Sequence, residues 1–513
     1  MLEDIGRSLV GRVFVYREPP FNWLPIFANC VDEHAYARGY QYAGDYHFAR
    51  TMLGAGAPWV THNASEARLF VVPTLFGLGP DAEVGPPLHS RFVRTNASDA
   101  VPGHPRGQCS ESAYEHALME TVKALKRSEF WGRVPHLFIS GGFQTLSGCR
   151  RLVVNGGTHK TAESHPHGLG STAPHGNQSN ASSSSSSHLG FQRDHCPARG
   201  LAGLHAAPRR LLFSSPRVVV GHFELDYDAG QRDLEGLVGV HVPYVANCAH
   251  GVPLCAMAGK CEPSTEWASR WAQHPLASRP MDFHLRGTGF LLNPIRLAAC
   301  AALQRVESGR EFVCFEAGVE TRQHGNDTSA LFHIQGEGDV RIDLPPCDDT
   351  RPCANRKPGE RALGGACPWR VPCRGAFSSD GYCDELLRSR FSLMTSGDTP
   401  SSRRLYDALE AGTLSVTLSA GLRATLSPLV EWDAFMPDAL VLASRGVAPI
   451  DIHASAAAMQ RLVDESECAL ARRQDAMLKW LPLLSWNYDP HMTSMHVLAQ
   501  AALQIKTHGW SEL

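Results

Sequence analysis

Ten short, continuously apolar segments constrain the fold of this chain more than any other feature. They are rich in Val, Leu, Ile and Phe, and they do not alternate between apolar and polar residues. A strand that is apolar on both faces is typical of a parallel sheet covered by helices on both sides. The first series comprises residues 12–16, 68–73, 136–141, 217–222 and 239–245, and the second comprises 282–287, 310–318, 390–395, 414–419 and 439–444.

Helical patterns separate several of these segments. Residues 111–131, for example, keep apolar positions at roughly helical spacing and leave charged positions to face water. Strand–helix–strand alternation predicts an α/β fold with right-handed crossovers. Because a chain of 513 residues is too long for one hydrophobic core, we predict two Rossmann-like domains that face a cleft.

The two series also suggest where the domains begin and end. We expect a first domain, a linker rich in Gly, Cys and Pro, a second domain, and C-terminal helices, at residues 1–250, 251–278, 279–470 and 471–513. Residues 155–195 are low-complexity Gly, Ser and His sequence, which predicts a disordered insertion because such sequence cannot bury a core. Residues 319–382 contain most of the cysteine cluster and predict a disulfide-tied loop.

Cysteine usage and sequons bear on the compartment. The chain has 15 cysteines and no Cys-x2–4-Cys pair of the kind that binds zinc, so disulfides in an oxidising compartment explain them better. The odd total leaves at least one thiol unpaired or paired with another chain. Asn-x-Ser/Thr sequons favour a secretory route, although Ser-rich composition alone explains two of them; they begin at Asn63, Asn96, Asn177, Asn180 and Asn326.

Two further observations limit the partners and the targeting. The formal charge of −3 gives no electrostatic case for nucleic acid or an anionic membrane as the main partner. The N-terminal sequence lacks a signal peptide, and no run of about 18 apolar residues occurs in the chain. Either the sequence is a fragment that lacks its anchor, or the protein is not secreted.

One strand is followed by a well-bounded helix within residues 397–412, "GDTPSSRRLYDALEAG". Gly397 permits a tight turn, Thr399 is the expected N-cap, and Pro400 suits the first helical position. Gly412 is the expected left-handed residue at the C-terminal end. A strand–turn–helix unit directs free N–H groups and the positive end of the helix dipole at the strand's carboxyl edge, where a diphosphate can bind.

The side chains of this helix support an anion site. Ser401 and Ser402 add hydroxyl donors, while Arg403 and Arg404 are unfavourable at a helix start unless an anion neutralises them. Asp407 can share a face with Arg404 and accept hydrogen bonds from ribose hydroxyls. The alternative is an intrahelical Arg–Asp pair on a solvated surface.

These residues resemble the exostosin family of glycosyltransferases, in the plant and algal branch of family 47. The segment "FSLMTSGDTPSSRRLYDALEAGTLSVTL" and the later "LSPLVEWDAF" are similar to that family's C-terminal pattern, in the same order. Weaker similarities include "VFVYREPPFN", "YAGDYHFARTMLGAGAPWVTHNASEARLFVVP" and "RPMDFHLRG". The resemblance covers most of the chain outside the two insertions.

The resemblance implies a GT-B fold and inverting transfer of a sugar from a UDP-sugar to a glycan. The first half would bind the acceptor and the second half the nucleotide sugar. The resemblance implies no metal, since such transferases commonly work without an Asp-x-Asp metal site. The tripeptide Asp226-Tyr227-Asp228 has that pattern but lies in the wrong half, so we interpret it as a coincidence. The implied donor-binding residues are Arg404 with Arg403 behind it for the diphosphate, Asp407 for the nucleoside, Ser401 and Ser402 as donors, and Arg286 and Arg296 to complete the anion pocket.

The catalytic base is less well marked. Asp45 corresponds to a family acid and His136 to a family histidine, and each is either the base or a structural residue. Pro135 stands where the family has an aspartate before that histidine. Three interpretations follow: an active Golgi transferase normally made as a type II membrane protein, an impaired member that binds nucleotide sugar or glycan and supports a partner transferase in a homo- or hetero-oligomer, or an unrelated Rossmann-type nucleotide-binding enzyme.

Overall fold

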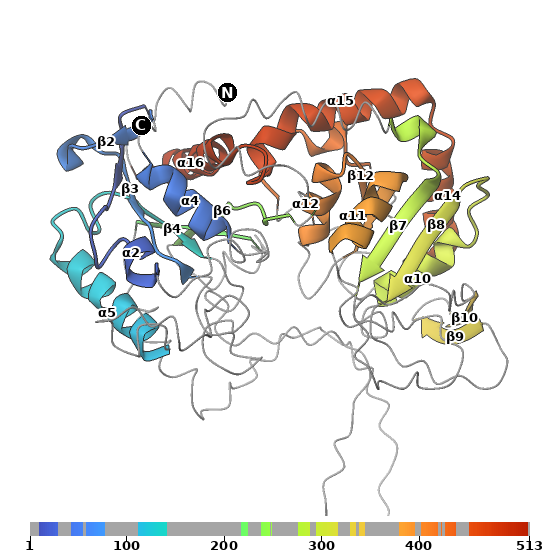
Figure 1. The fold of residues 1–513 in the computed structure, drawn as a ribbon, viewed down its shortest axis with the longest axis horizontal. Helices are drawn as coiled ribbons and strands as arrows, with labels where there is room; N and C mark the ends of the chain where they lie inside the picture. The colour runs from blue at the N-terminus through green and yellow to red at the C-terminus, as the bar shows by residue number, and fades with distance from the viewer. Residues whose placement is uncertain are drawn as a thin grey trace, which may run out of the picture.

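A computed structural model describes a large part of the chain. The described residues are 10–28, 43–54, 58–76, 111–140, 217–223, 237–246, 248, 275–287, 294–316, 329–334, 338–343, 379–395, 402–418, 422, 426–437 and 451–510. They form two parallel sheets and one antiparallel strand pair, with helices around the sheets (Figure 1). The α/β class predicted from the sequence is confirmed.

The first sheet has six strands in the order β2-β1-β3-β4-β5-β6, and every pairing is parallel. Its strands are β1 (Val13–Val15), β2 (Val60–Thr61), β3 (Leu69–Val72), β4 (His136–Ser140), β5 (Val218–His222) and β6 (Leu237–His241). The helices of this half are α2 (Leu24–Phe27), α4 (Gly44–Leu53) and α5 (Glu111–Arg127), with the 3-10 turn η1 (Ala64–Glu66). The β3 strand is buried along its whole length, as its apolar sequence predicted.

The second sheet has four parallel strands in the order β12-β11-β7-β8. Its strands are β7 (Met281–Gly287), β8 (Glu311–Glu316), β11 (Ser389–Met394) and β12 (Leu414–Thr417). Its helices and 3-10 turns are α10 (Pro294–Leu303), α11 (Ser379–Arg388), α12 (Arg403–Glu410), η5 (Leu276–Ser278) and η7 (Trp432–Ala434). The chain runs from β7 to β8 on one side and then places β11 on the other side, so the strand order reverses between β7 and β11.

Nine of the ten apolar segments are strands, and the tenth, 439–444, lies outside the described residues. The sequence did not predict β2, which has only two residues. It also predicted a loop for 319–382, and this is wrong where β9 (Ser329–Ile334) pairs antiparallel with β10 (Gly338–Asp343). The low-complexity insertion at 155–195 lies outside the described residues.

The C-terminal helices connect the two halves. They are α14 (Ile452–Val463), α15 (Glu467–Leu484) and α16 (Pro490–Thr507). The α14 helix packs on α10 and α15 packs on α12, whereas α16 returns to the first half and packs on β6 and α4 (Figure 1). Gln500 of α16 accepts a hydrogen bond from the His241 amide at 3.2 Å and donates one to the His241 carbonyl at 2.9 Å. None of the helices in the described residues is both long and apolar enough to span a membrane.

Contacts from α11, from α12 and from the segment after α15 fasten the second half to the first. The Tyr406 hydroxyl lies 2.8 Å from His241 Nε2, and Trp486 Nε1 donates to the Pro243 carbonyl at 2.7 Å. A disulfide between Cys248 and Cys383 joins positions 135 residues apart in the sequence. Cys468 carries a free, exposed thiol. Apolar residues of both halves belong to one continuous buried cluster.

Candidate functional site

The carboxyl ends of β7 and β11 mark the place where a doubly wound sheet binds ligands. In such sheets the crevice opens where the strand order reverses, because the connections on either side of that point leave in opposite directions. Arg286 is the penultimate residue of β7, and Thr395 follows the last residue of β11. The register pairs Phe391 with Phe283, so both positions are at the same edge of the sheet.

The α12 helix begins at this edge, and its first residue is not the one that the sequence predicted. Ser402 is the N-cap, in an extended conformation with φ −157° and ψ 139°, and its Oγ accepts a hydrogen bond from the Arg404 amide at 3.3 Å. The predictions of Thr399 as N-cap and Pro400 as first helical residue are therefore wrong. Residues 396–401, including Ser401, lie outside the described residues.

The other end of α12 is as predicted. Gly412 has φ 64°, in the left-handed region that favours glycine. Its amide donates to the Leu409 carbonyl at 3.1 Å, and the Thr413 amide donates to the Ala408 carbonyl at 2.9 Å. This pair of hydrogen bonds is the Schellman motif, which ends the helix and leads directly into β12.

Arg404 occupies the second position of α12 and is only partly exposed. Its guanidinium donates one hydrogen bond, at 3.0 Å, to the neutral hydroxyl of Thr395. Burial, together with the nearby positive charge of Arg296, lowers the pKa of Arg404 to about 10. The negative charge of Asp407 raises the pKa of Arg404. However, no carboxylate among the described residues lies within ion-pair distance of Arg404.

Arg296 comes from α10, which follows β7, and it is 6% exposed. Two arginines that the sequence assigned to an anion pocket are therefore brought together from different helices. Arg286 lies at the end of β7, in register with Phe315 of β8, and its side chain is outside the described part of the structure.

Asp407 and Arg403 form an ion pair within α12, with Arg403 Nε 3.4 Å from Asp407 Oδ2. The pair is not on a solvated surface, because the Asp407 side chain is only 1% exposed. A buried carboxylate beside arginines keeps its capacity to accept hydrogen bonds from a ligand. The alternative prediction was an intrahelical Arg–Asp pair on a solvated surface. The structure contains such a pair, but its carboxylate is buried.

Tyr382 of α11 lies near Asp407 and Arg404, but the sequence did not predict it as a site residue. Burial raises the pKa of the Tyr382 hydroxyl well above its usual value of 10.0, and the negative charge of Asp407 raises it further. Arg404 and Arg403 are also close enough to affect it. The helical pattern "SDGYCDELLR" just before a strand could have indicated it. The predicted cysteine-rich insertion, 319–382, includes Tyr382 as its last residue.

The two candidate bases lie at different positions along the strand direction of the first sheet. Asp45 is 1% exposed in the first turn of α4, and its Oδ1 accepts from the Tyr46 amide at 2.7 Å. The neighbouring Gly44 lies against Phe223, which follows the carboxyl end of β5. Asp45 is therefore close to the carboxyl edge, on the same side of the molecule as Trp486.

His136 is the first residue of β4 and is fully buried. Its Nδ1 lies 2.8 Å from the Val134 carbonyl and its Nε2 lies 3.2 Å from the Tyr16 hydroxyl, so both ring nitrogens have partners. Burial lowers the pKa of His136 to about 4, which keeps the ring neutral. It lies four residues before the carboxyl end of β4, roughly 13 Å along the strand, so the structure does not bring it together with Asp45.

No protein-family model matches the sequence, and no curated protein matches it either. Among the described residues, no group of three or more His, Cys, Asp and Glu side chains is arranged to hold a metal ion. The tripeptide Asp226-Tyr227-Asp228 lies outside the described residues.

Proposed function

We propose that this protein is an inverting glycosyltransferase of GT-B type, which transfers a sugar from a UDP-sugar to a glycan acceptor. One observation carries the proposal: Arg404 and Arg296 come together at the start of α12, beside the point where the strand order reverses. The resemblance of the surrounding residues to exostosin glycosyltransferases supports a nucleotide sugar over other phosphate ligands.

The electrostatics of this pair favour a multiply charged anion. The positive charges of Arg404 and Arg296 repel each other, and partial burial strengthens this repulsion relative to water. A diphosphate between Arg404 and Arg296 would replace this repulsion with two charge-assisted attractions. The positive end of the α12 dipole would add to the same attraction, since α12 begins at this site.

Asp407 and Tyr382 would recognise the nucleoside. The Asp407 carboxylate can accept hydrogen bonds from ribose hydroxyls, and Arg403, at 3.4 Å from Oδ2, would hold that carboxylate in place. Tyr382 is protonated at neutral pH, as burial raises its pKa still further above that range, so its hydroxyl can donate a hydrogen bond.

The reaction would be a single displacement. The acceptor hydroxyl attacks the anomeric carbon, the bond from that carbon to the diphosphate oxygen breaks, and a base takes the hydroxyl proton. Arg404 and Arg296 would stabilise the negative charge that develops on the departing UDP. Asp45 is the better candidate base, since it lies near the carboxyl edge of the first sheet, whereas His136 is committed to the core.

The proposed location is the Golgi lumen, with the protein normally anchored as a type II membrane protein. The Cys248–Cys383 disulfide supports an oxidising compartment, and the sequon residue Asn63 is exposed. The proposed partners are the UDP-sugar, a glycan acceptor and another transferase in a homo- or hetero-oligomer; no metal cofactor and no nucleic acid is proposed.

The test is UDP release from a panel of UDP-sugars with glycan acceptors. We expect turnover with at least one donor, a loss of at least about tenfold in Arg404→Ala, and no change in Arg305→Ala. Arg305 is a matched control because it is an exposed arginine just after α10. Turnover that survives Arg404→Ala would rule out the proposed site.

A second candidate function is binding of a nucleotide sugar without turnover, in support of a partner transferase. It is favoured by Pro135, which replaces the family's aspartate, and by His136, whose two ring nitrogens are already partnered. Tight UDP binding with no turnover for any donor and acceptor would favour this function. If the protein turns over, Asp45→Asn should lower kcat and leave UDP affinity unchanged, because Asp45 is the proposed base and is not a proposed UDP contact.

A further inference from the structure

A row of arginines lies at the opposite edge of the first sheet. Arg12, Arg68 and Arg217 each immediately precede a strand, namely β1, β3 and β5. The strand order places β1, β3, β4 and β5 next to one another, and all of them are parallel. Because parallel strands begin at the same edge, the three arginines span about 14 Å of that edge, at about 4.8 Å per strand.

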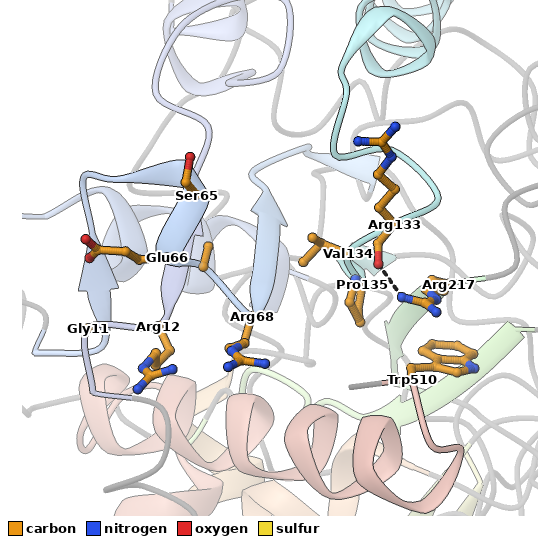
Figure 2. Close-up of a pocket in the computed structure, with 11 residues that line it drawn as sticks. Gly11, Arg12, Ser65, Glu66, Arg68, Arg133, Val134, Pro135, Arg217 and Trp510 are labelled. Carbon is orange, nitrogen blue, oxygen red and sulfur yellow. Dashed lines mark hydrogen bonds between the residues drawn. The ribbon is translucent and has the colours of Figure 1, made fainter. Parts of the chain in front are cut away.

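These arginines line a cavity of about 610 Å³, which we call the arginine cavity. Arg12, Arg68, Arg217, Glu66, Pro135 and Trp510 are among its lining residues (Figure 2). The backbone around it is already hydrogen-bonded, since the Arg68 amide donates to the Arg12 carbonyl at 2.7 Å and the His136 amide to the Arg217 carbonyl at 3.0 Å. Recognition by the arginine cavity therefore depends on its side chains.

The side chains give the arginine cavity a positive charge. Among the described lining residues Glu66 is the single acidic one, and its carboxylate already accepts a hydrogen bond from Asn63 Nδ2 at 2.8 Å. The Arg12 guanidinium is exposed and forms neither a hydrogen bond nor an ion pair within the described part of the chain. Arg217 donates to the Arg133 carbonyl, while the Arg133 guanidinium points away from the other three arginines (Figure 2).

Trp510 supplies an aromatic surface to the arginine cavity. Trp510 follows α16, and its amide donates to the Ile505 carbonyl at 3.1 Å, which holds it at the end of the helix. Its indole is partly exposed and lies beside Arg217 (Figure 2). Arginine forks match the oxygens of phosphate and sulfate, and a flat indole offers a surface for a ring.

We propose that the arginine cavity binds a small phosphate or sulfate ester that carries a ring, with Arg12, Arg68 and Arg217 around the oxyanion and Trp510 against the ring. This site is separate from the one at α12, because it lies at the amino edge of the other sheet. It does not depend on the proposed transferase activity.

The experiment is calorimetric titration of the full chain with glucose 6-phosphate, N-acetylglucosamine 6-sulfate, inorganic phosphate and glucose at constant ionic strength. We expect at least one ester to bind and glucose not to bind. Arg12→Gln should weaken that binding about tenfold without affecting the fold, since the Arg12 side chain is exposed and forms no hydrogen bond or ion pair with the residues that the structure describes. Arg133→Gln is the matched control, which removes the same charge nearby and should change affinity less than about twofold.

Two further variants make the test specific. Trp510→Ala should weaken binding of the ester and leave the weaker binding of inorganic phosphate unchanged. Arg404→Ala should leave ester binding intact, which distinguishes the arginine cavity from the site at α12. No binding of either ester at about 10 mM, or equal weakening by Arg12→Gln and Arg133→Gln, would overturn the proposal.

Discussion

Two arginines of the second half, Arg279 and Arg404, differ in what surrounds them. Arg279 is 2% exposed and donates to the Leu386, Ser389 and Ala411 carbonyls and to Thr413 Oγ1, at 2.8–3.4 Å. Arg404 donates to one neutral hydroxyl and lies near a second arginine. Burial lowers the pKa of both, to about 9 for Arg279 and about 10 for Arg404. Arg279 is therefore a structural residue, whereas Arg404 keeps donors for a ligand.

The amino edges of the two sheets show the same difference. In the second sheet, Asp282 lies 2.7 Å from Arg390 NH1 and 3.9 Å from Arg310 Nε, so a buried carboxylate balances the arginines there. In the first sheet, the described lining of the arginine cavity has four arginines and one carboxylate, that of Glu66. An arginine cluster around a buried carboxylate holds the fold together, whereas the arginine cavity has more described arginines than carboxylates and is suited to bind an external anion.

The largest effect should come from Arg279→Ala. This change leaves several buried acceptors without their donor, and the free energy of unfolding should fall by about 3–5 kcal/mol. Chemical denaturation measures this loss, with Arg305→Ala as the control that changes stability by less than about 0.5 kcal/mol. A loss below about 1 kcal/mol would show that Arg279 is not a structural residue.

Arg404→Ala should have the opposite profile. UDP affinity should fall by about 2 kcal/mol, or roughly 30-fold, because a charged donor to the diphosphate is lost. The free energy of unfolding should stay the same or rise slightly, since repulsion from Arg296 is relieved. Calorimetry and denaturation on the same samples measure both quantities. Loss of stability with unchanged UDP affinity would make Arg404 structural like Arg279.

The buried His241 behind α12 provides a test by pH. Burial, together with the nearby His496 and His222, lowers the pKa of His241 to about 3. Between pH 6.5 and 3 the unfolded chain binds a proton at His241 and the folded protein does not, so stability falls as the pH falls. His241→Gln should reduce this slope by up to about 1.4 kcal/mol per pH unit, measured by denaturation between about pH 5 and 6.5. An unchanged slope would contradict a neutral His241 beside Tyr406.

The smallest effect concerns the N-cap of α12. Ser402→Ala removes the acceptor of the Arg404 amide and should cost about 1 kcal/mol in the free energy of unfolding. Ser402→Asp retains an acceptor and should restore stability while weakening UDP binding, since it adds a negative charge beside Arg404. Equal stability of the wild type and Ser402→Ala would show that Ser402 does not begin the helix.

The sequence predicted the strands well because buried parallel strands are continuous apolar runs such as 69–72 and 218–222. It placed the N-cap of α12 incorrectly, because several residues in "GDTPSS" are good caps and the backbone conformation chooses among them. It brought Arg296 and Arg404 to one site only through the family resemblance. The arginine cavity was not predicted, since Arg12, Arg68 and Arg217 meet only through the strand order.

We propose that α12 and the arginines near it bind a diphosphate. The most direct test of this proposal is calorimetric titration of the protein with UDP, UMP and uridine under the same conditions. The account predicts that UDP binds and that uridine binds at least about 100-fold more weakly, with UMP between them, because the phosphates supply the contacts with Arg404 and Arg296. UDP binding no tighter than uridine, or no UDP binding at all, would contradict it.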